Sequence, residues 1–310
     1  MTFAADELLD AARKSVDARL AVLLETPGAG PQRLMQAMRH SLLAPSKRVR
    51  ALLALIVARE FGGGEAAAAD LGCALEMVHA ASLILDDLPA MDDAELRRGL
   101  PANHRVFGEA TAILAAIGLM NRAYGVAAEC LEMDFSARVE AVDVLQRSIG
   151  VHGLVGGQEE DLHDCKTYST EQKLEGMYGR KTGALFAAAA ELGAIAASQS
   201  NLRAELWRFG WEIGVGFQIL DDVVDSMARK DRAGKDVNKD RGRPSFPSLI
   251  GAMPARTRAR AKIETAVAAA GHLAVLHGGN GQLLGAFTRR LTRAFDEILD
   301  EPGALLAAGE

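Results

Sequence analysis

The sequence predicts an all-α fold in which the whole chain, residues 1–310, forms a single helical domain. The composition is 49% hydrophobic but only 5% aromatic, so the core would be built from small and medium side chains. Long windows are rich in Ala and Leu and contain few runs of β-branched residues, which favours helices over strands. No repeat of fixed period and no long linker divides the sequence, which indicates one domain.

Helical segments follow one another along the chain, separated by breaks rich in Gly, Pro or charged residues. The breaks at 26–31 and 62–64 end the first and third helices. A polar connector at about 88–106 and a charged loop at about 229–246 interrupt the apolar pattern. The predicted helices cover approximately residues 4–25, 32–43, 46–60, 66–86, 109–133, 137–150, 152–165, 170–198, 201–228, 248–271 and 279–300.

Charge and composition restrict the partners of the protein. A net charge of −6 lacks the basic footprint of a protein that binds nucleic acid. Acidic residues such as Asp6 stand where a signal peptide would have a basic start and an apolar core. No window reaches 18 uninterrupted apolar residues, and the best one, at 183–197, contains Glu191. The cysteines form no C-x-x-C pair, which indicates reduced thiols, so we expect a cytoplasmic protein without stable membrane insertion.

A dense acidic stretch follows the fourth predicted helix. Residues 86–99 read D-D-L-P-A-M-D-D-A-E-L-R-R-G and hold five carboxylates, followed by Arg97 and Arg98. Mg²⁺ favours one or two carboxylates together with substrate phosphates, and the planar guanidinium suits phosphate oxygens. The stretch therefore predicts a magnesium–diphosphate site.

A second acidic cluster lies on one face of the helix predicted at 201–228. Gln218, Asp221, Asp222 and Asp225 stand at positions i, i+3, i+4 and i+7. Alone, such a stripe is as readily a solvated charge run as a metal site. Two clusters, each at the end of an apolar helical segment, make metal binding the better interpretation.

Cations and glycines add to this picture. Lys47 and Arg50 are spaced to share a face of the third predicted helix, and His79 lies two turns before Asp86. Lys181 stands in a helix otherwise poor in charge. Each has a plainer explanation as a surface cation or a packed histidine. Glycines inside the helices around Lys181 and the second cluster indicate either a narrow apolar channel or tight helix packing.

These motifs together resemble those of the trans-isoprenyl diphosphate synthases. The stretch at 86–99 and F-Q-I-L-D-D-V-V-D at 217–225 are similar to the two aspartate-rich motifs of that family. The shorter matches are K-R-V-R (47–50), G-Q-E-E-D (157–161), K-T (181–182) and G-K-D (234–236). The resemblance runs from about residue 45 to 250. It implies an all-α helical bundle around a central cavity, usually a homodimer, that joins isopentenyl diphosphate to an allylic diphosphate with Mg²⁺.

The resemblance also implies roles for individual residues. The metal ligands would be Asp86, Asp92 and Asp221, which together with Lys181 would form the catalytic set. The allylic diphosphate would be held by Arg97, Lys181, Thr182, Gln218 and Lys235. Isopentenyl diphosphate would be held by Lys47, Arg50, His79 and Arg98. Gln158 and Asp161 would line the allylic site, and the loop at 229–246 would close over it.

Product length depends on the residues just before the first acidic stretch. Ala81 and Ser82 lie about one turn before Asp86, where the growing tail should pass. Short-chain members of the family often carry an aromatic residue there, so small side chains favour geranylgeranyl diphosphate. The stretch at 79–93 especially resembles the synthases of carotenoid pathways. A farnesyl diphosphate synthase is the main alternative. A class I terpene cyclase or a non-catalytic prenyltransferase subunit fits less well, because a cation set for a second diphosphate and both acidic motifs are present.

Overall fold

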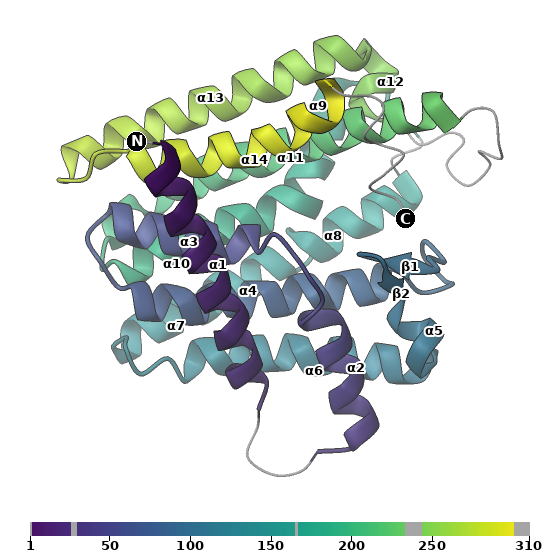
Figure 1. Ribbon diagram of the computed structural model, residues 1–310, viewed down its shortest axis with the longest axis horizontal. Helices are drawn as coiled ribbons and strands as arrows, with labels where there is room; N and C mark the ends of the chain where they lie inside the picture. Colours follow the sequence, from purple (N-terminus) through teal and green to yellow (C-terminus); the bar gives the residue numbers. More distant parts are fainter. Residues whose placement is uncertain (1, 26–29, 165–166, 233–243, 301–310) are drawn as a thin grey trace. The chain divides into compact units, whose positions relative to one another are not determined.

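The computed structural model describes residues 2–25, 30–164, 167–232 and 244–300, and it confirms the all-α prediction (Figure 1). In these ranges the only strands are β1 (Leu96–Arg97) and β2 (Leu100–Pro101), which pair as a small antiparallel hairpin. The contacts within the chain divide it into two compact units. Unit 1 comprises Met1–Leu145 and Glu191–Asn201, and unit 2 comprises Gln146–Ala190 and Leu202–Glu310. The single domain and the central cavity therefore remain predictions.

Unit 1 is built around one central helix, α4 (Glu65–Asp86). The other helices of this unit are α1 (Thr2–Leu24), α2 (Gln32–Leu42), α3 (Val49–Glu60), α5 (Asn103–Phe107), α6 (Glu109–Ala128) and most of α7 (Phe135–Ile149). Helices α1, α2, α3 and α6 all pack against α4, which is apolar around most of its circumference. At Gly72 a Cβ atom would come within 2.8 Å of the Cα of Ala51, so glycine lets α3 and α4 approach closely.

Unit 2 contains the remaining elements. They are α8 (Leu154–Glu159), the π-helix η1 (Glu160–Asp164), α9 (Glu171–Tyr178), the π-helix η3 (Gly179–Gly183), α10 (Ala184–Ala196, which ends in unit 1), the 3₁₀ turn η4 (Ser200–Leu202), α11 (Arg203–Arg232), α12 (Phe246–Ile250), α13 (Ala252–Leu276) and α14 (Gln282–Asp300). Figure 1 shows α13 and α14 lying along α11. This unit holds the second acidic cluster on α11.

Glycines in unit 2 serve close packing. A Cβ at Gly210 would lie 2.3 Å from the carbonyl oxygen of Phe186, and one at Gly214 would lie 2.7 Å from the Cα of Gly183. A Cβ at Gly157 would meet the backbone nitrogen of Lys181 at 2.2 Å. Of the two interpretations that the sequence left open for these glycines, tight helix packing is the one that the contacts support.

Several predicted elements differ in detail from those observed. The helix predicted at 170–198 is divided by the π-helix η3, and the one at 248–271 is broken at Gly251, whose φ of 91° no other residue type adopts easily. The connector at 88–106 contains the hairpin and α5. The third helix begins at Val49, so Lys47 precedes it and does not share a helix face with Arg50; that prediction was wrong.

Among the described helices, α4 and α6 are long and apolar enough to cross a membrane by length and composition alone. In α4, 67% of the most apolar window is buried inside the protein, as expected of a core helix. In α6 the buried share is 39%, because one side of the helix exposes large apolar residues. Such helices occur in the cores of soluble proteins, so they are weak support for a membrane protein.

Candidate active site

The first acidic stretch folds into a tight turn at the end of α4. The backbone N–H of Asp92 donates to the carbonyl oxygen of Asp86 at 2.9 Å, and that of Ala94 donates to Asp87 at 3.2 Å. Asp93 adopts a positive φ of 46°, which an aspartate tolerates better than most residues. The turn brings Asp92 back beside Asp86. The two residues predicted as metal ligands in this stretch are therefore neighbours in space.

Asp87, between them in sequence, points into unit 1. Its side chain is 3% exposed, and its Oδ1 atom accepts hydrogen bonds from Nε of Arg97, at 2.9 Å, and from Nη2 of the same residue. Burial lowers the pKa of Arg97, but the hydrogen bond and the charge of Asp87 outweigh this and raise it. Arg97, predicted to hold a diphosphate, is thus charged and fixed in direction by a buried carboxylate. Nothing in the sequence pattern indicated this pair.

The R-R-G sequence forms the turn of the β1–β2 hairpin. Arg97 pairs with Leu100 across the hairpin, and the two residues between them, Arg98 and Gly99, have φ values of 55° and 76°. Two consecutive positive φ values are typical of the two-residue turn that matches the twist of a hairpin. Glycine adopts this conformation without strain, whereas Arg98 does not. The turn therefore fixes the backbone that carries both arginines.

A buried ion pair organises the cations near α3. Arg48 caps the start of α3 with a φ of 49° and is 2% exposed. Its Nε atom donates to Oδ1 of Asp17 at 2.7 Å, and its Nη1 atom lies 3.6 Å from Oε2 of Glu76. Glu76, also 2% exposed, accepts a hydrogen bond from the backbone N–H of Ala51 at 3.3 Å. Neither Arg48 nor Glu76 was assigned a role from the sequence. Glu76 could have been singled out, because it is a lone carboxylate in the apolar run of α4.

The charges of Arg48 and Glu76 contribute to the pKa shifts of residues that were predicted to bind isopentenyl diphosphate. Burial lowers the pKa of Arg50 to about 10; the charge of Glu76 opposes the shift and that of Arg98 adds to it. Burial also lowers the pKa of Arg98. Both arginines stay charged at neutral pH. Burial, and then the charges of Arg50 and Arg98, bring the pKa of His79 well below its ordinary value, so its ring is neutral at pH 7. Lys47 lies exposed in the loop before α3.

Two π-helices in unit 2 face each other with opposite charges. In η3, Lys181 forms an ion pair with Asp161 of η1, and Nη2 of Arg180 lies 2.5 Å from Oε2 of Glu160. The close approach at Gly157 packs α8, which leads directly into η1, against η3. Single π-turns occur frequently at functional sites, because they redirect side chains that a regular helix would not present. Lys181 and Asp161, predicted for the allylic site, are thus brought together.

The second acidic cluster lies on α11, as predicted. Asp221 and Asp225 are exposed, whereas Asp222 turns toward Tyr178 of α9. The hydroxyl of Tyr178 donates to Oδ2 of Asp222, and Nε2 of Gln218 donates to Oδ1 at 3.3 Å. Burial raises the pKa of Asp222 to about 7, against the lowering effect of these two hydrogen bonds. Tyr178 was missed because the tyrosine is far from this cluster in sequence.

Thr182 completes this network. Its Oγ1 donates to Oε1 of Gln218 at 2.8 Å, so both ends of the Gln218 amide are occupied by side chains of the protein. Two of the five residues predicted to hold the allylic diphosphate, Thr182 and Gln218, are therefore bonded to each other. Lys235 lies outside the described residues, and so does most of the predicted closing loop at 229–246.

The residues present suit Mg²⁺ shared with a substrate. Among the described residues, no group of three or more His, Cys, Asp or Glu side chains is placed to hold a metal ion. Mg²⁺ does not require such a group, because it usually keeps waters and binds one or two carboxylates plus phosphate oxygens. Asp86 and Asp92, adjacent across the turn and partly or fully exposed, are oxygen donors of that kind.

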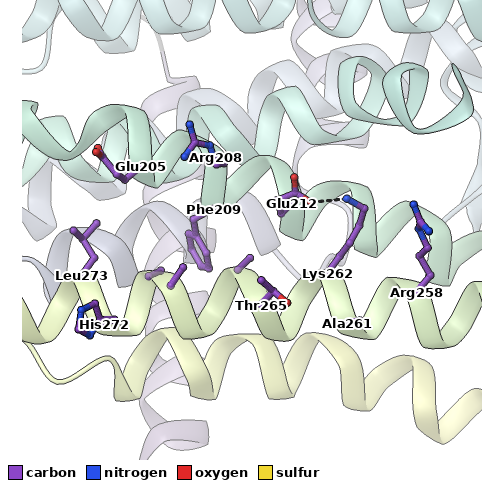
Figure 2. A pocket seen from close by; sticks show the side chains of 13 residues that line it. Glu205, Arg208, Phe209, Glu212, Arg258, Ala261, Lys262, Thr265, His272 and Leu273 are labelled. Carbon is purple, nitrogen blue, oxygen red and sulfur yellow. Dashed lines mark hydrogen bonds and ion pairs between the residues drawn. The ribbon is translucent and has the colours of Figure 1, made fainter. Parts of the chain in front are cut away.

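Two cavities are described, and neither is lined by Ala81 or Ser82. The larger, of about 700 Å³, lies between α11 and α13, with an apolar floor and charged residues such as Arg208 and Lys262 at its edges (Figure 2). It contains none of the predicted site residues. The smaller, of about 20 Å³, lies beside Asp87 and Arg97 and has room for one water.

The chain-length residues lie on α4, as expected. Ala81 is fully buried, and Ser82 is half-buried with its hydroxyl donating to the carbonyl oxygen of His79 at 3.0 Å. Because α4 is continuous from Glu65 to Asp86, both residues lie one turn or slightly more before Asp86. Their role in product length remains a prediction.

Known proteins resemble the chain over most of its length. Residues 31–273 match the family described as polyprenyl synthetase. A geranylgeranyl diphosphate synthase of Pseudescherichia vulneris is 41% identical over 83% of this chain and 84% of its own length. A farnesyl diphosphate synthase of Bacillus subtilis (strain 168) is 39% identical over 77% of this chain and 82% of its own length. A geranyltransferase of Helicobacter pylori, solved in complex with magnesium and isoprenyl diphosphate, has a TM-score of 0.79 at 25% identity and covers 94% of this chain and 97% of that one.

The family match, the relatives and the fold agree with one another. The family covers well over half of the chain, and both relatives are named as prenyl diphosphate synthases. The two aspartate-rich motifs lie at the end of α4 and on α11, and Arg97 and Lys181 are paired with carboxylates as described above. The chain belongs to the polyprenyl synthetase family, the trans-isoprenyl diphosphate synthases, and is a prenyltransferase.

Proposed function

We propose that the protein condenses isopentenyl diphosphate with an allylic diphosphate to form geranylgeranyl diphosphate and pyrophosphate, using Mg²⁺. The observation that carries the product assignment is the small side chain of Ala81 on α4, one to two turns before Asp86. The relative with 41% identity, a geranylgeranyl diphosphate synthase, supports the same length. A farnesyl product is the second candidate, because a farnesyl diphosphate synthase is almost equally similar.

Two separate cation sets would bind the two diphosphates. Arg97, directed by Asp87, and Lys181, directed by Asp161, would hold the allylic diphosphate. Arg50 and Arg98 would hold isopentenyl diphosphate, with His79 as a neutral hydrogen-bonding partner. Guanidinium groups donate to phosphate oxygens in a fixed planar geometry, which orients each substrate as well as attracting it.

The chain's own groups would then assist departure of the pyrophosphate. Positive charge at Arg97 and Lys181 stabilises the negative charge that develops on the leaving group. When bound at Asp86, Asp92 and Asp221, Mg²⁺ would add Lewis-acid stabilisation of the same charge. The lowered pKa of His79 makes its ring a weak base, in keeping with pyrophosphate as the acceptor of the proton that is lost.

We also propose a cytoplasmic homodimer that neither inserts into a membrane nor binds nucleic acid. Helix α6 exposes Ile113, Leu114 and Ile117, and α7 exposes Phe135 and Val139. A second copy of the chain would cover these side chains, since contiguous exposed apolar patches usually mark interfaces. The net charge of −6 would oppose association with nucleic acid or an anionic membrane surface.

The test is to incubate the purified protein with Mg²⁺, isopentenyl diphosphate and, separately, dimethylallyl, geranyl or farnesyl diphosphate. Chromatography of the dephosphorylated products then gives their length. A twenty-carbon alcohol as the main product supports the proposal, and a fifteen-carbon end product would assign the farnesyl alternative. Absence of condensation with every primer would contradict the proposed reaction.

A further inference from the structure

The middle carboxylate of the second acidic cluster is held by a residue outside every motif. Tyr178, the last residue of α9, is 5% exposed and donates its hydroxyl hydrogen to Oδ2 of Asp222. The ring of Phe246 packs against it, with the two centroids 5.7 Å apart. A buried tyrosine hydroxyl needs a partner, and here that partner is a carboxylate of the D-D-V-V-D sequence.

The contact extends as a chain of hydrogen bonds across three elements. Asp222 accepts from Nε2 of Gln218 at 3.3 Å, and Oε1 of Gln218 accepts from Oγ1 of Thr182 at 2.8 Å. Tyr178 of α9 is thereby linked through α11 to Thr182 of η3. The bonds also fix the direction of the Gln218 amide, because its oxygen and its nitrogen each have a defined partner.

Neighbouring carboxylates of the cluster consequently differ in their surroundings. Asp221 and Asp225 are exposed, whereas Asp222 is held between Tyr178 and Gln218. Asp222 is thus placed to fix the position of α11 relative to α9 and η3, while its exposed neighbours face outward. A shift of Asp222 would displace Gln218 and, through it, Thr182.

We propose that Tyr178 is a positioning residue for the diphosphate end of the reaction. It anchors Asp222 and thereby sets the spacing between Thr182 on η3 and the exposed carboxylates Asp221 and Asp225 on α11. This inference rests on the proposed roles of Thr182 and Asp221 toward the allylic diphosphate and Mg²⁺. The hydroxyl is what matters, because the ring alone would pack on Phe246 in a phenylalanine variant as well.

The test compares Tyr178→Phe with wild type and with Tyr124→Phe, which makes the same chemical change at a half-buried tyrosine of α6. Loss of the buried hydrogen bond to the Asp222 carboxyl is expected to raise the KM for the allylic diphosphate about tenfold. The KM for isopentenyl diphosphate and the circular dichroism spectrum of Tyr178→Phe should stay unchanged. In Tyr124→Phe the KM values for both substrates should stay unchanged.

A second readout does not depend on turnover. Mg²⁺ with inorganic pyrophosphate should raise the unfolding temperature of the wild type, and Tyr178→Phe should need about tenfold more pyrophosphate for the same rise. Equal titration curves for the variant and the wild type, together with an equal allylic KM, would overturn the positioning role alone. No stabilisation of the wild type by Mg²⁺ and pyrophosphate would remove the proposed metal–diphosphate site, and this inference with it.

A double-mutant cycle covers the case in which Tyr178→Phe folds poorly. Asp222→Asn keeps the shape of the side chain but replaces one of the two carboxyl oxygens that accept from Tyr178 and Gln218 with an amide nitrogen. If Tyr178 acts through Asp222, adding Tyr178→Phe to Asp222→Asn should change the pyrophosphate concentration needed for the same rise in unfolding temperature by less than twofold. Two fully additive effects would show that the tyrosine does not act through this carboxylate, and would overturn the proposal.

Discussion

The buried pair between Arg48 and Glu76 gives a quantitative prediction for the variant Glu76→Gln. Both side chains are 2% exposed, and their closest charged atoms are 3.6 Å apart. Removing one partner of such a pair leaves a buried charge without compensation, which typically costs about 3–5 kcal/mol. The glutamine keeps nearly the same volume, so packing around α4 changes little.

Two features of this site reduce the expected loss. Arg48 retains its 2.7 Å contact with Asp17 and a hydrogen bond to the carbonyl oxygen of Ala44 at 3.2 Å. The amide oxygen of a glutamine would still accept from the backbone N–H of Ala51. We therefore expect a loss near the low end, about 2–3 kcal/mol, or roughly 4–10 °C in unfolding temperature.

The matched control is Asp17→Asn, which removes the other partner of Arg48. The side chain of Asp17 is 40% exposed, so water compensates Arg48 there and the loss should stay below about 1 kcal/mol. Urea unfolding followed by circular dichroism measures both variants. If Glu76→Gln is no less stable than Asp17→Asn, the buried pair does not anchor α3 to α4 and the reasoning fails.

Three further predictions concern pH, product length and assembly. Because the pKa of His79 is lower in the folded than in the unfolded protein, stability should fall as pH drops below about 6.5, by at most about 1.4 kcal/mol per pH unit. Urea unfolding of His79→Gln should lack that part of the pH dependence, whereas the exposed-site variant His152→Gln should retain it. Ala81→Tyr should shorten the product in the primer assay, with overpacking costing about 1–3 kcal/mol; an unchanged product length would refute the chain-length argument. Ile117→Glu on α6 should yield monomers in sedimentation, whereas Val275→Glu, equally exposed on α13, should not; a dimeric Ile117→Glu would place the interface elsewhere.

The helices were predictable because each carries a local pattern. The apolar run of α4 ends at Asp86, the residue at which the acidic stretch begins, so the helix and the start of the site could both be read from neighbouring residues. The division of one long predicted helix by η3 could not be read in this way. A π-turn keeps the composition of a helix and changes only its hydrogen-bond spacing, which tertiary contacts such as that at Gly157 help to set.

The candidate site could be proposed from sequence by its residue types, but its pairings could not be predicted. The acidic clusters and the arginines stand out in sequence, but the residues that direct them come from elsewhere in the chain. Asp161 is 20 residues from Lys181, and Tyr178 is 44 residues from Asp222. Such pairs depend on how helices pack, and a periodic pattern within one helix carries no information about its neighbour.

Within each unit, the described cations that we propose as substrate ligands are compensated by carboxylates of the same unit. Arg97 is held by Asp87 and Lys181 by Asp161, while Glu76 compensates Arg48 and acts electrostatically on Arg50 and Arg98. Clustered positive charges would repel one another and sample many rotamers if no carboxylate compensated them. Pairing removes both problems before a substrate arrives, so less side-chain entropy is lost when a diphosphate binds. The carboxylates that are not metal ligands in our proposal are therefore as necessary to the site as the cations that they hold.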